Sequence, residues 1–255
     1  MKLKIGFIGS GNVAWHFARA LNAAGHSIIQ VISREKNHAK ALADVYDCVY
    51  STDVKKLSPD VELCIVCVSD DQLTTVAKQI PSSDNIVVHT CGSHSINILE
   101  TTGENHGVFY PLQSFSKDRQ VDINSVPFLL EASNPETLIV LHTIASSLSH
   151  YVLTSDSEAR LKYHLSAVLV NNFVNHLYVE AETYLIDNQL DFNVLKPIIK
   201  ETAMKIQNLS PVEAQTGPAK RGDDETIKQH LKLLEDSKNL KALYKTLSDV
   251  IEKTQ

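Results

Sequence analysis

The sequence predicts an α/β fold in which a doubly wound parallel sheet is followed by an all-helical C-terminal domain. Up to residue 154, short apolar runs alternate with amphipathic stretches, which is the pattern of strands joined by crossover helices. Beyond residue 154 the strand signals stop and only helical spacing remains. We therefore predict one domain over residues 1–154 and an all-α domain over residues 155–255.

Strands of the first domain are predicted where short apolar runs lie between turn residues. They are residues 3–8, 27–32, 48–50, 63–68, 86–89, 107–110 and 126–131. Helices are predicted between them, at residues 13–24, 37–46, 70–80, a short stretch ending near 100, and 135–148. The last of these has Asn134 as its N-cap and Pro135 in its first position, which is typical of a helix start.

Helices of the second domain are predicted from their starting residues. A capping box, Ser155-x-x-Glu158, opens a long helix that ends near residue 186. Asp191 caps the next one, and Ser210-Pro211 opens a short one. The remaining predictions are residues 225–234 and 239–252.

Composition narrows the class of protein. The 255 residues suit two modest domains, and a hydrophobic content of 43% supports a substantial core. The net charge of −6 gives no basic surface for nucleic acid, and no apolar stretch reaches the length of a membrane span. The four cysteines are typical of reduced thiols, so we expect a cytoplasmic protein. Cys64 and Cys67 have redox-motif spacing, but they lie within a predicted strand, which favours a structural role.

The first glycine turn is the most informative motif. Gly9-Ser10-Gly11-Asn12-Val13-Ala14 follows the first strand and opens the first helix, so it has the G-x-G-x-x-A form of a Rossmann dinucleotide-binding unit. Backbone N–H groups at such a helix start bind a diphosphate. A plain glycine turn is the alternative.

The end of the second strand indicates which dinucleotide binds. Ser33 and Arg34 offer a hydroxyl and a guanidinium, which suit the 2′-phosphate of NADP. Glu35 follows at once and favours NAD, so NAD stays the less favoured alternative. Arg34 could also be an ordinary solvated loop residue.

Polar residues follow the next strands, at the edge where open parallel sheets bind ligands. Val68, Ser69, Thr90, Gly92 and Ser93 are expected to bind the cofactor. Ser69 and the loop from Thr90 to Ser93 would border the nicotinamide and its ribose. Further candidate groups there are Asp70, residues 89–94 and residues 110–114. Strand-end capping and turn formation are the alternative for each of them.

The long helix carries the candidate catalytic residues. His164, Asn171 and Asn175 recur at spacings of seven and four, so they are expected to share one apolar face. His164 could donate a proton to a carbonyl or imine as it receives hydride, and Asn171 could orient the substrate. Helix packing is the alternative, and for Asn172 and Asn175 it is favoured.

The loop from Thr216 to Asp224 is a third candidate. Arg221 could pair with an aspartate to fix a contact or could bind an anionic substrate, while a solvated loop with Asp223 or Asp224 as N-cap is the alternative. The histidines are scattered, so no cluster has zinc-like spacing and no metal site is expected.

These motifs together resemble a known family that joins a Rossmann-like domain to a helical domain of unknown function. The resemblance rests on the glycine turn and on Ser33-Arg34, His89-Thr90-x-Gly92-Ser93, Tyr110-Pro111-Leu112-Gln113-Ser114-Phe115, Tyr163-His164, Asn171-Asn172 and Thr216-Gly217-Pro218-Ala219-x-Arg221-Gly222-Asp223. It covers nearly the whole chain. The family is distantly similar to pyrroline-5-carboxylate reductase, to deazaflavin-dependent NADP oxidoreductase and to the 6-phosphogluconate and β-hydroxyacid dehydrogenase group.

The resemblance implies an NADP-binding fold and a helical domain that forms a dimer. Members are described as NADP oxidoreductases without an agreed substrate. The β-hydroxyacid relatives use a lysine and an asparagine four residues apart, but here Lys162 is followed by Ser166 at that spacing. Their catalytic residues therefore do not carry over.

We thus predict an NADP-dependent oxidoreductase that transfers hydride between a nicotinamide cofactor and a small carbonyl, imine or hydroxy substrate bound between the domains. The alternative is a non-catalytic NADP(H)-binding dimer that acts as a sensor or scaffold. A methyltransferase is a weaker third possibility. A homodimer through the C-terminal helices is expected, because helices packed alone would leave apolar faces exposed.

Overall fold

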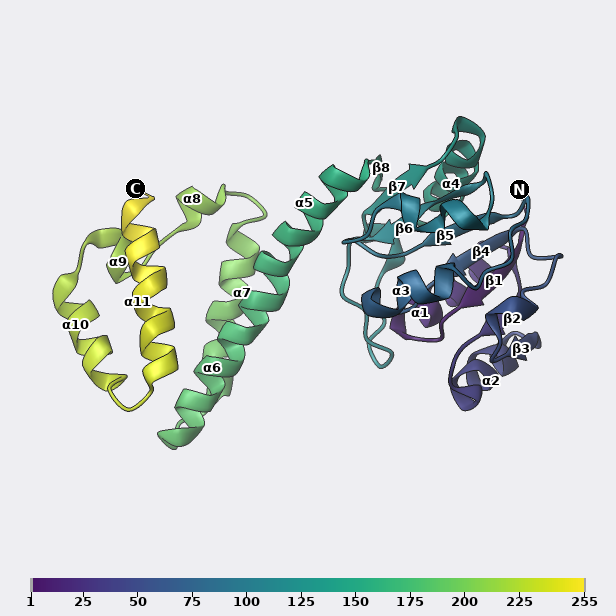
Figure 1. Cartoon of the computed structure of the whole chain (residues 1–255). Coiled ribbons are helices and arrows are strands. Elements are labelled where there is room, and N and C mark those ends of the chain that lie inside the picture. Colours follow the sequence, from purple (N-terminus) through teal and green to yellow (C-terminus); the bar gives the residue numbers. More distant parts are fainter. Residues whose placement is uncertain (1, 255) are drawn as a thin grey trace. The chain divides into compact units, whose positions relative to one another are not determined.

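The computed structural model describes residues 2–254 (Figure 1). Its internal contacts divide the chain into two compact units, Met1–Val170 and Asn171–Gln255. All strands of the described residues lie in the first unit, and every element after β8 (Val152–Thr154) is helical. Within residues 2–254, no helix combines the length and the apolar character that crossing a membrane requires.

The first unit contains one eight-stranded sheet of order β3-β2-β1-β4-β5-β6-β7-β8. The chain winds outward from β1 in both directions, which confirms the doubly wound prediction. In the register, Ile8 pairs with both Ile32 and Val66, so β1, β2 and β4 end side by side. Their carboxyl ends therefore form one crevice, where such sheets bind ligands. The strands are β1 (Lys4–Ile8), β2 (Ser27–Ile32), β3 (Val49–Ser51), β4 (Leu63–Val66), β5 (Ile86–His89), β6 (His106–Pro111) and β7 (Phe128–Ala132).

One end of the sheet departs from the predicted parallel order. β7 runs antiparallel to β6, while β8 runs parallel to β7. The sequence analysis missed β8, because a three-residue strand between two helices is too short to show alternation.

Helices cover both faces of the sheet (Figure 1). On one face, Phe17 and Leu42 from two helices pack with Phe7 of β1. On the other face, Leu73 and Leu99 pack with Cys64 and Val66 of β4 and their neighbours. The helices of this unit are α1 (Asn12–Ala23), α2 (Lys36–Val45), α3 (Asp70–Ala77), α4 (Pro135–Leu148) and α5 (Ser157–Ala167), with 3₁₀ turns η1 (Val54–Lys56), η2 (Ile96–Thr102) and η3 (Ile123–Ser125).

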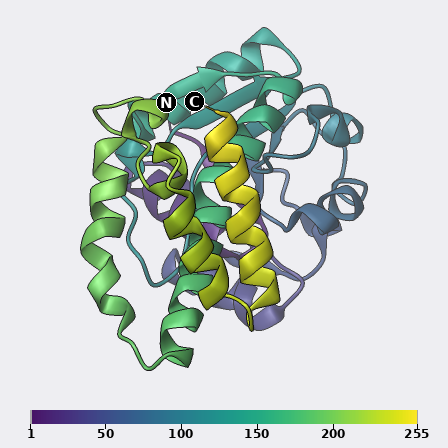
Figure 2. The ribbon, with the colours of Figure 1, turned by 90° about the vertical axis from the view of Figure 1, so that its left-hand side faces the viewer.

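The second unit is helical throughout its described residues. Its 3₁₀ turn η5 (Phe192–Leu195) is capped by Asp191, as predicted. Ser210 caps the predicted short helix and forms a capping box with Glu213. The short helix α9 packs against α10 and α11, which run antiparallel to each other (Figures 1 and 2). The helices are α6 (Val174–Asp187), α7 (Lys196–Lys205), α8 (Pro211–Ala214), α9 (Pro218–Arg221), α10 (Asp224–Leu233) and α11 (Lys238–Lys253).

The long helix differs from its prediction in two respects. It begins at Ser157, because the Asp156 side chain accepts a hydrogen bond of 2.7 Å from the Ala159 N–H; the predicted box of Ser155 and Glu158 is wrong. It also contains a π-helical turn, η4 (Val168–Phe173), between α5 and α6. The division between the two units falls within this wider turn.

Candidate functional site

A cavity of about 600 Å³ opens around the first glycine turn. Eight predicted cofactor residues line it: Gly9, Ser10, Gly11, Asn12, Ser33, Arg34, Val68 and Ser69. They come from the ends of β1, β2 and β4 and from the start of α1, so the register of the sheet brings them together. The cavity therefore occupies the crevice that the strand order creates.

The two glycines of the turn have different physical roles. Gly9 has a φ of +107°, and a Cβ there would lie 2.3 Å from the backbone oxygen of Cys67. Gly11 precedes α1, and a Cβ on it would meet no atom within 4 Å, so this side of the turn is open. No side chain caps α1, which leaves the amides at its start to bind an anion.

The candidate residues for the 2′-phosphate lie at the rim of the cavity. Ser10 Oγ donates a hydrogen bond of 2.8 Å to Ser33 Oγ. Arg34 is 82% exposed, and its Nε lies 3.6 Å from the Glu35 carboxylate. His38, from the first turn of α2, lines the same cavity. Arg34 is thus free to turn toward a phosphate, in competition with its neighbour Glu35.

Four predicted cofactor residues do not line this cavity. Val13 packs against the core. Thr90 is tied to β4, since its N–H donates a hydrogen bond of 3.2 Å to the Val66 oxygen. Gly92 and Ser93 lie instead in the loop that follows β5, and each is next to a different group of interacting side chains.

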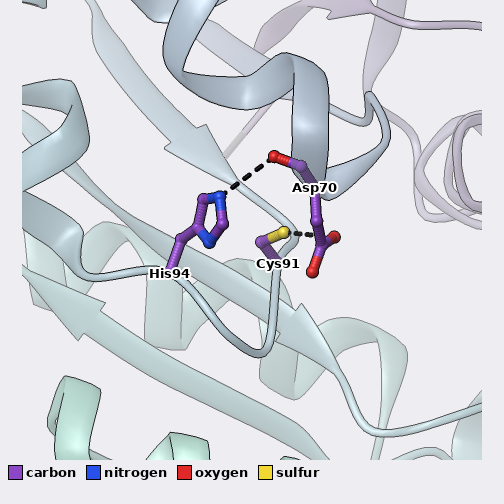
Figure 3. Close-up of side chains that lie close together, drawn as sticks. All are labelled: Asp70, Cys91 and His94. Carbon is purple, nitrogen blue, oxygen red and sulfur yellow. Dashed lines mark hydrogen bonds between the residues drawn. The ribbon is translucent and has the colours of Figure 1, made fainter.

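The first of these groups contains Asp70, Cys91 and His94 (Figure 3). Cys91 Sγ donates to Asp70 Oδ1 at 2.6 Å, and Ser93 Oγ donates to Asp70 Oδ2 at 2.6 Å. His94 Nε2 lies 3.0 Å from the backbone oxygen of Asp70. Burial raises the pKa of the Cys91 thiol to about 12, so it is protonated here. These three residues are neighbours only in the folded chain, so their spacing in the sequence did not indicate that they form a group.

The second group is a pair formed by Tyr110 and His164. The Tyr110 hydroxyl lies 3.0 Å from His164 Nδ1. Burial, and then the charge of Asp70, raise the pKa of Tyr110 to about 12, which keeps the phenol neutral. A Cβ at Gly92 would lie 2.6 Å from His164 Nδ1 and 2.8 Å from Tyr110 Cζ. A side chain at position 92 would therefore force the imidazole or the phenol of this pair to shift.

A buried arginine holds α5 so that His164 reaches Tyr110. Arg160 is the one buried residue of α5 and is fully buried. Its guanidinium bonds to the Glu131 carboxylate of β7 and donates to the His94 backbone oxygen. Because His164 lies one turn further on the same helix, this anchor also sets the position of the imidazole.

The other predicted site residues lie in the second unit. Asn171 and Asn175 are exposed in the single chain, so within it they do not lie on a buried apolar face. Asn171 also lies within the π-helical turn, where a spacing of seven no longer follows one helix face. Arg221 pairs with Asp223 at 3.9 Å, and Asp223 caps α10 by accepting from the Thr226 N–H.

Sequence reasoning missed several residues that line the cavity. Four of them, Gln72, Thr75, Val76 and Gln79, recur at the spacing of three and four that puts residues on one face of a helix. The helical periodicity of the sequence could therefore have identified them. Lys117 comes from the loop after β6 and had no such signal. Its Nζ lies 5.4 Å from the ring centre of Trp15.

Comparisons with known proteins identify the family of this chain. Residues 4–91 match the family described as NADP oxidoreductase coenzyme F420-dependent, and residues 126–251 match a domain of unknown function (DUF2520). A solved structure from Bacteroides fragilis, provisionally named an NADP oxidoreductase, is 40% identical, covers 99% of this chain and 98% of its own, and has a TM-score of 0.90. The chain belongs to this NADP oxidoreductase family. The resemblance inferred from the motifs is thus confirmed.

More distant structures share the fold of this NADP oxidoreductase family. The 1-pyrroline-5-carboxylate reductase of Streptococcus pyogenes is 14% identical over 99% of both chains, with a TM-score of 0.63. A reductive aminase of Aspergillus terreus, solved with NADPH and ethyl levulinate, is 14% identical over 96% of this chain and 93% of its own, with a TM-score of 0.72. No curated protein matches the sequence.

Proposed function

We propose that the protein uses NADPH to transfer hydride to a small carbonyl or imine compound, or catalyses the reverse reaction on a hydroxy compound or amine. The observation that carries this proposal is the Tyr110–His164 pair, which provides a transferable proton near the carboxyl edge of the sheet that the cofactor cavity also occupies. Hydride adds to the substrate carbon, and the substrate oxygen or nitrogen then takes a proton. A reductase that uses NADPH needs both a hydride from the cofactor and a proton donor for the substrate oxygen or nitrogen.

In this proposal His164 gives the proton and Tyr110 positions its ring. Tyr110 Oη and His164 Nδ1 share one hydrogen bond, and in this proposal the phenol is its donor, which places the ring proton of His164 on Nε2. As that proton passes to the substrate, the Tyr110 proton moves to Nδ1, so the imidazole stays neutral, and solvent then returns a proton to the Tyr110 oxygen. Asn171 remains a candidate for orienting the substrate.

The expected result for His164→Asn is a fall in kcat of about 10²- to 10⁴-fold, the usual contribution of a positioned acid. Turnover is measured as NADPH oxidation across a panel of keto acids, aldehydes and cyclic imines, and NADPH affinity by fluorescence. His142→Asn, an exposed histidine of α4, is the matched control and should keep full activity. Equal turnover of the two variants on an identified substrate would remove the proposed role of His164. Binding of NADPH without turnover on any substrate would favour the sensor or scaffold.

Cofactor preference gives a second test. We propose that Ser33 and Arg34 bind the 2′-phosphate, so Arg34→Gln should weaken NADPH binding about 10- to 100-fold, as expected for a charged hydrogen bond. NADH binding should change little. Glu35→Gln is the paired variant and should strengthen NADPH binding, because it removes the competing carboxylate. Equal losses for NADH and NADPH in Arg34→Gln would contradict 2′-phosphate recognition.

We also propose that the second unit mediates a homodimer. Among residues 171–254, only Ala219, Leu234 and Ser248 are buried, while large apolar side chains such as Leu177 and Ile198 are exposed. An 85-residue helical unit with so little buried surface needs a partner, and a second copy is the common solution. Sedimentation equilibrium at micromolar concentration should give the mass of two chains. A compact monomer at that concentration would contradict the dimer.

We further propose that the protein works in the reducing cytoplasm. Cys48, Cys64, Cys67 and Cys91 are all free thiols. Burial raises the pKa of Cys64 well above its usual range, so the thiol is unreactive despite its redox-motif spacing with Cys67. Cysteines that are close in sequence and remain free thiols suit a compartment that does not form disulfides.

A further inference from the structure

We propose that Asp70, Cys91 and His94 form a binding site for one divalent ion of the zinc class, with a fourth coordination position open. This proposal is independent of hydride transfer, because it concerns metal binding by a folded protein. The three side chains come from the first residue of α3 and from the loop after β5 (Figure 3). One donor atom from each lies within 4.8 Å of the other two.

The donor set favours zinc over the hard cations. A thiolate, an imidazole and a carboxylate are all common zinc ligands, whereas magnesium and calcium prefer oxygen alone. Three protein ligands with an open fourth position is the arrangement of catalytic rather than structural zinc sites. The fourth position would take water or a substrate oxygen.

Hydrogen bonds from neighbouring groups orient His94 and Asp70 within this cluster. His94 Nε2 donates to the backbone oxygen of Asp70, which fixes the tautomer and leaves Nδ1 unprotonated. Ser93 gives its single hydroxyl proton to Asp70 Oδ2 at 2.6 Å, which orients the carboxylate, although its Oγ is also 3.2 Å from His94 Nδ1. Metal-binding histidines and carboxylates are generally held by a second hydrogen bond of this kind. We assign His94 Nδ1, Asp70 Oδ1 and Cys91 Sγ as the donor atoms, which bind the ion once the hydrogen bond between Cys91 and Asp70 breaks.

Small side-chain rotations suffice to accommodate the ion. Zinc lies about 2.0–2.3 Å from nitrogen, oxygen and sulfur ligands, so the donors must move by on the order of an ångström. The hydrogen bond from Cys91 to Asp70 breaks, the thiol proton passes to solvent, and the thiolate and carboxylate both bind the ion. Asp70 is exposed and Cys91 is buried, so the site has an entry side and a protected side.

Cobalt substitution tests the proposal with a readout that does not depend on activity. Purified protein is treated with a chelator, and Co²⁺ is then added while the absorption spectrum is recorded. A bound ion should give a thiolate-to-cobalt charge-transfer band and the visible bands of a tetrahedral site, saturating at about one equivalent and displaced by Zn²⁺. Cys91→Ser should abolish the charge-transfer band, and His94→Gln should weaken binding.

Two further variants serve as a control and as a test of the residue that orients Asp70. Cys48→Ser changes a half-buried thiol outside the cluster and should leave the spectrum unchanged. Ser93→Ala removes the bond that orients Asp70 and should weaken metal affinity about 10- to 100-fold without abolishing the band. A folded protein that gives no charge-transfer band, or a band that persists in Cys91→Ser, would overturn the proposal.

Discussion

Arg160→Met is expected to lower the free energy of unfolding by about 3–5 kcal/mol, the usual cost of breaking a buried ion pair. The guanidinium is fully buried, and its loss leaves the Glu131 carboxylate, which is only 17% exposed, without its cation. The His94 backbone oxygen loses its donor as well. Urea denaturation followed by circular dichroism measures the effect.

The same helix provides the control for this prediction. Lys162 pairs with Glu158 at 2.6 Å, but both side chains are more than 70% exposed. Because exposed pairs contribute little, Lys162→Met should change the unfolding free energy by less than about 1 kcal/mol. A double variant, Arg160→Met with Glu131→Leu, should recover part of the loss, since no charge is then left unpaired. Equal stabilities of the Arg160 and Lys162 variants would show that the buried pair does not anchor α5.

Gly92→Ala is expected to reduce kcat by about 10²- to 10⁴-fold, as much as loss of the proton donor itself. The added Cβ would lie 2.6 Å from His164 Nδ1, so the imidazole must leave its position against Tyr110. NADPH binding should be retained, because Gly92 does not line the cofactor cavity. Turnover and NADPH fluorescence titration, measured on the same preparation, separate the two effects.

Gly11→Ala is the complementary variant. Its Cβ meets no protein atom within 4 Å, so the fold should be unaffected, but the methyl group would occupy space that a diphosphate needs. Gly11→Ala should therefore weaken NADPH binding and have little effect on kcat. Gly92→Ala should do the reverse, lowering kcat while NADPH binding is retained. If Gly92→Ala kept full turnover, the Tyr110–His164 pair would not be the source of the proton.

Local signals predicted the doubly wound sheet and eight of the residues that line one cavity. The turn from Gly9 to Ala14, the strand before it and the helix after it are adjacent in sequence. The strand and helix that the motif requires could therefore be recognised from the residues next to it. Eight of the predicted residues line one cavity, because the carboxyl ends of parallel strands meet at one edge. The family resemblance extended the prediction of an NADP oxidoreductase to nearly the whole chain, including the helical C-terminal domain.

The residues that sequence reasoning missed depend on contacts between distant segments. Tyr110 was noted as a group at a strand end, but nothing in its spacing joined it to His164, 54 residues away. Asp70 and Cys91 are likewise neighbours only because β4 and β5 are. The prediction for Asn171 was wrong in its premise, since helical spacing assumed a regular α-helix and the chain has a π-helical turn there.

Titration calorimetry of the folded wild-type protein with NADPH tests the central claim most directly. If the amides at the start of α1 bind the cofactor diphosphate, the titration should show saturable heat at one site per chain, weakened by Gly11→Ala and stronger for NADPH than for NADH. Absence of heat from either coenzyme, with protein shown to be folded by circular dichroism, would contradict the account.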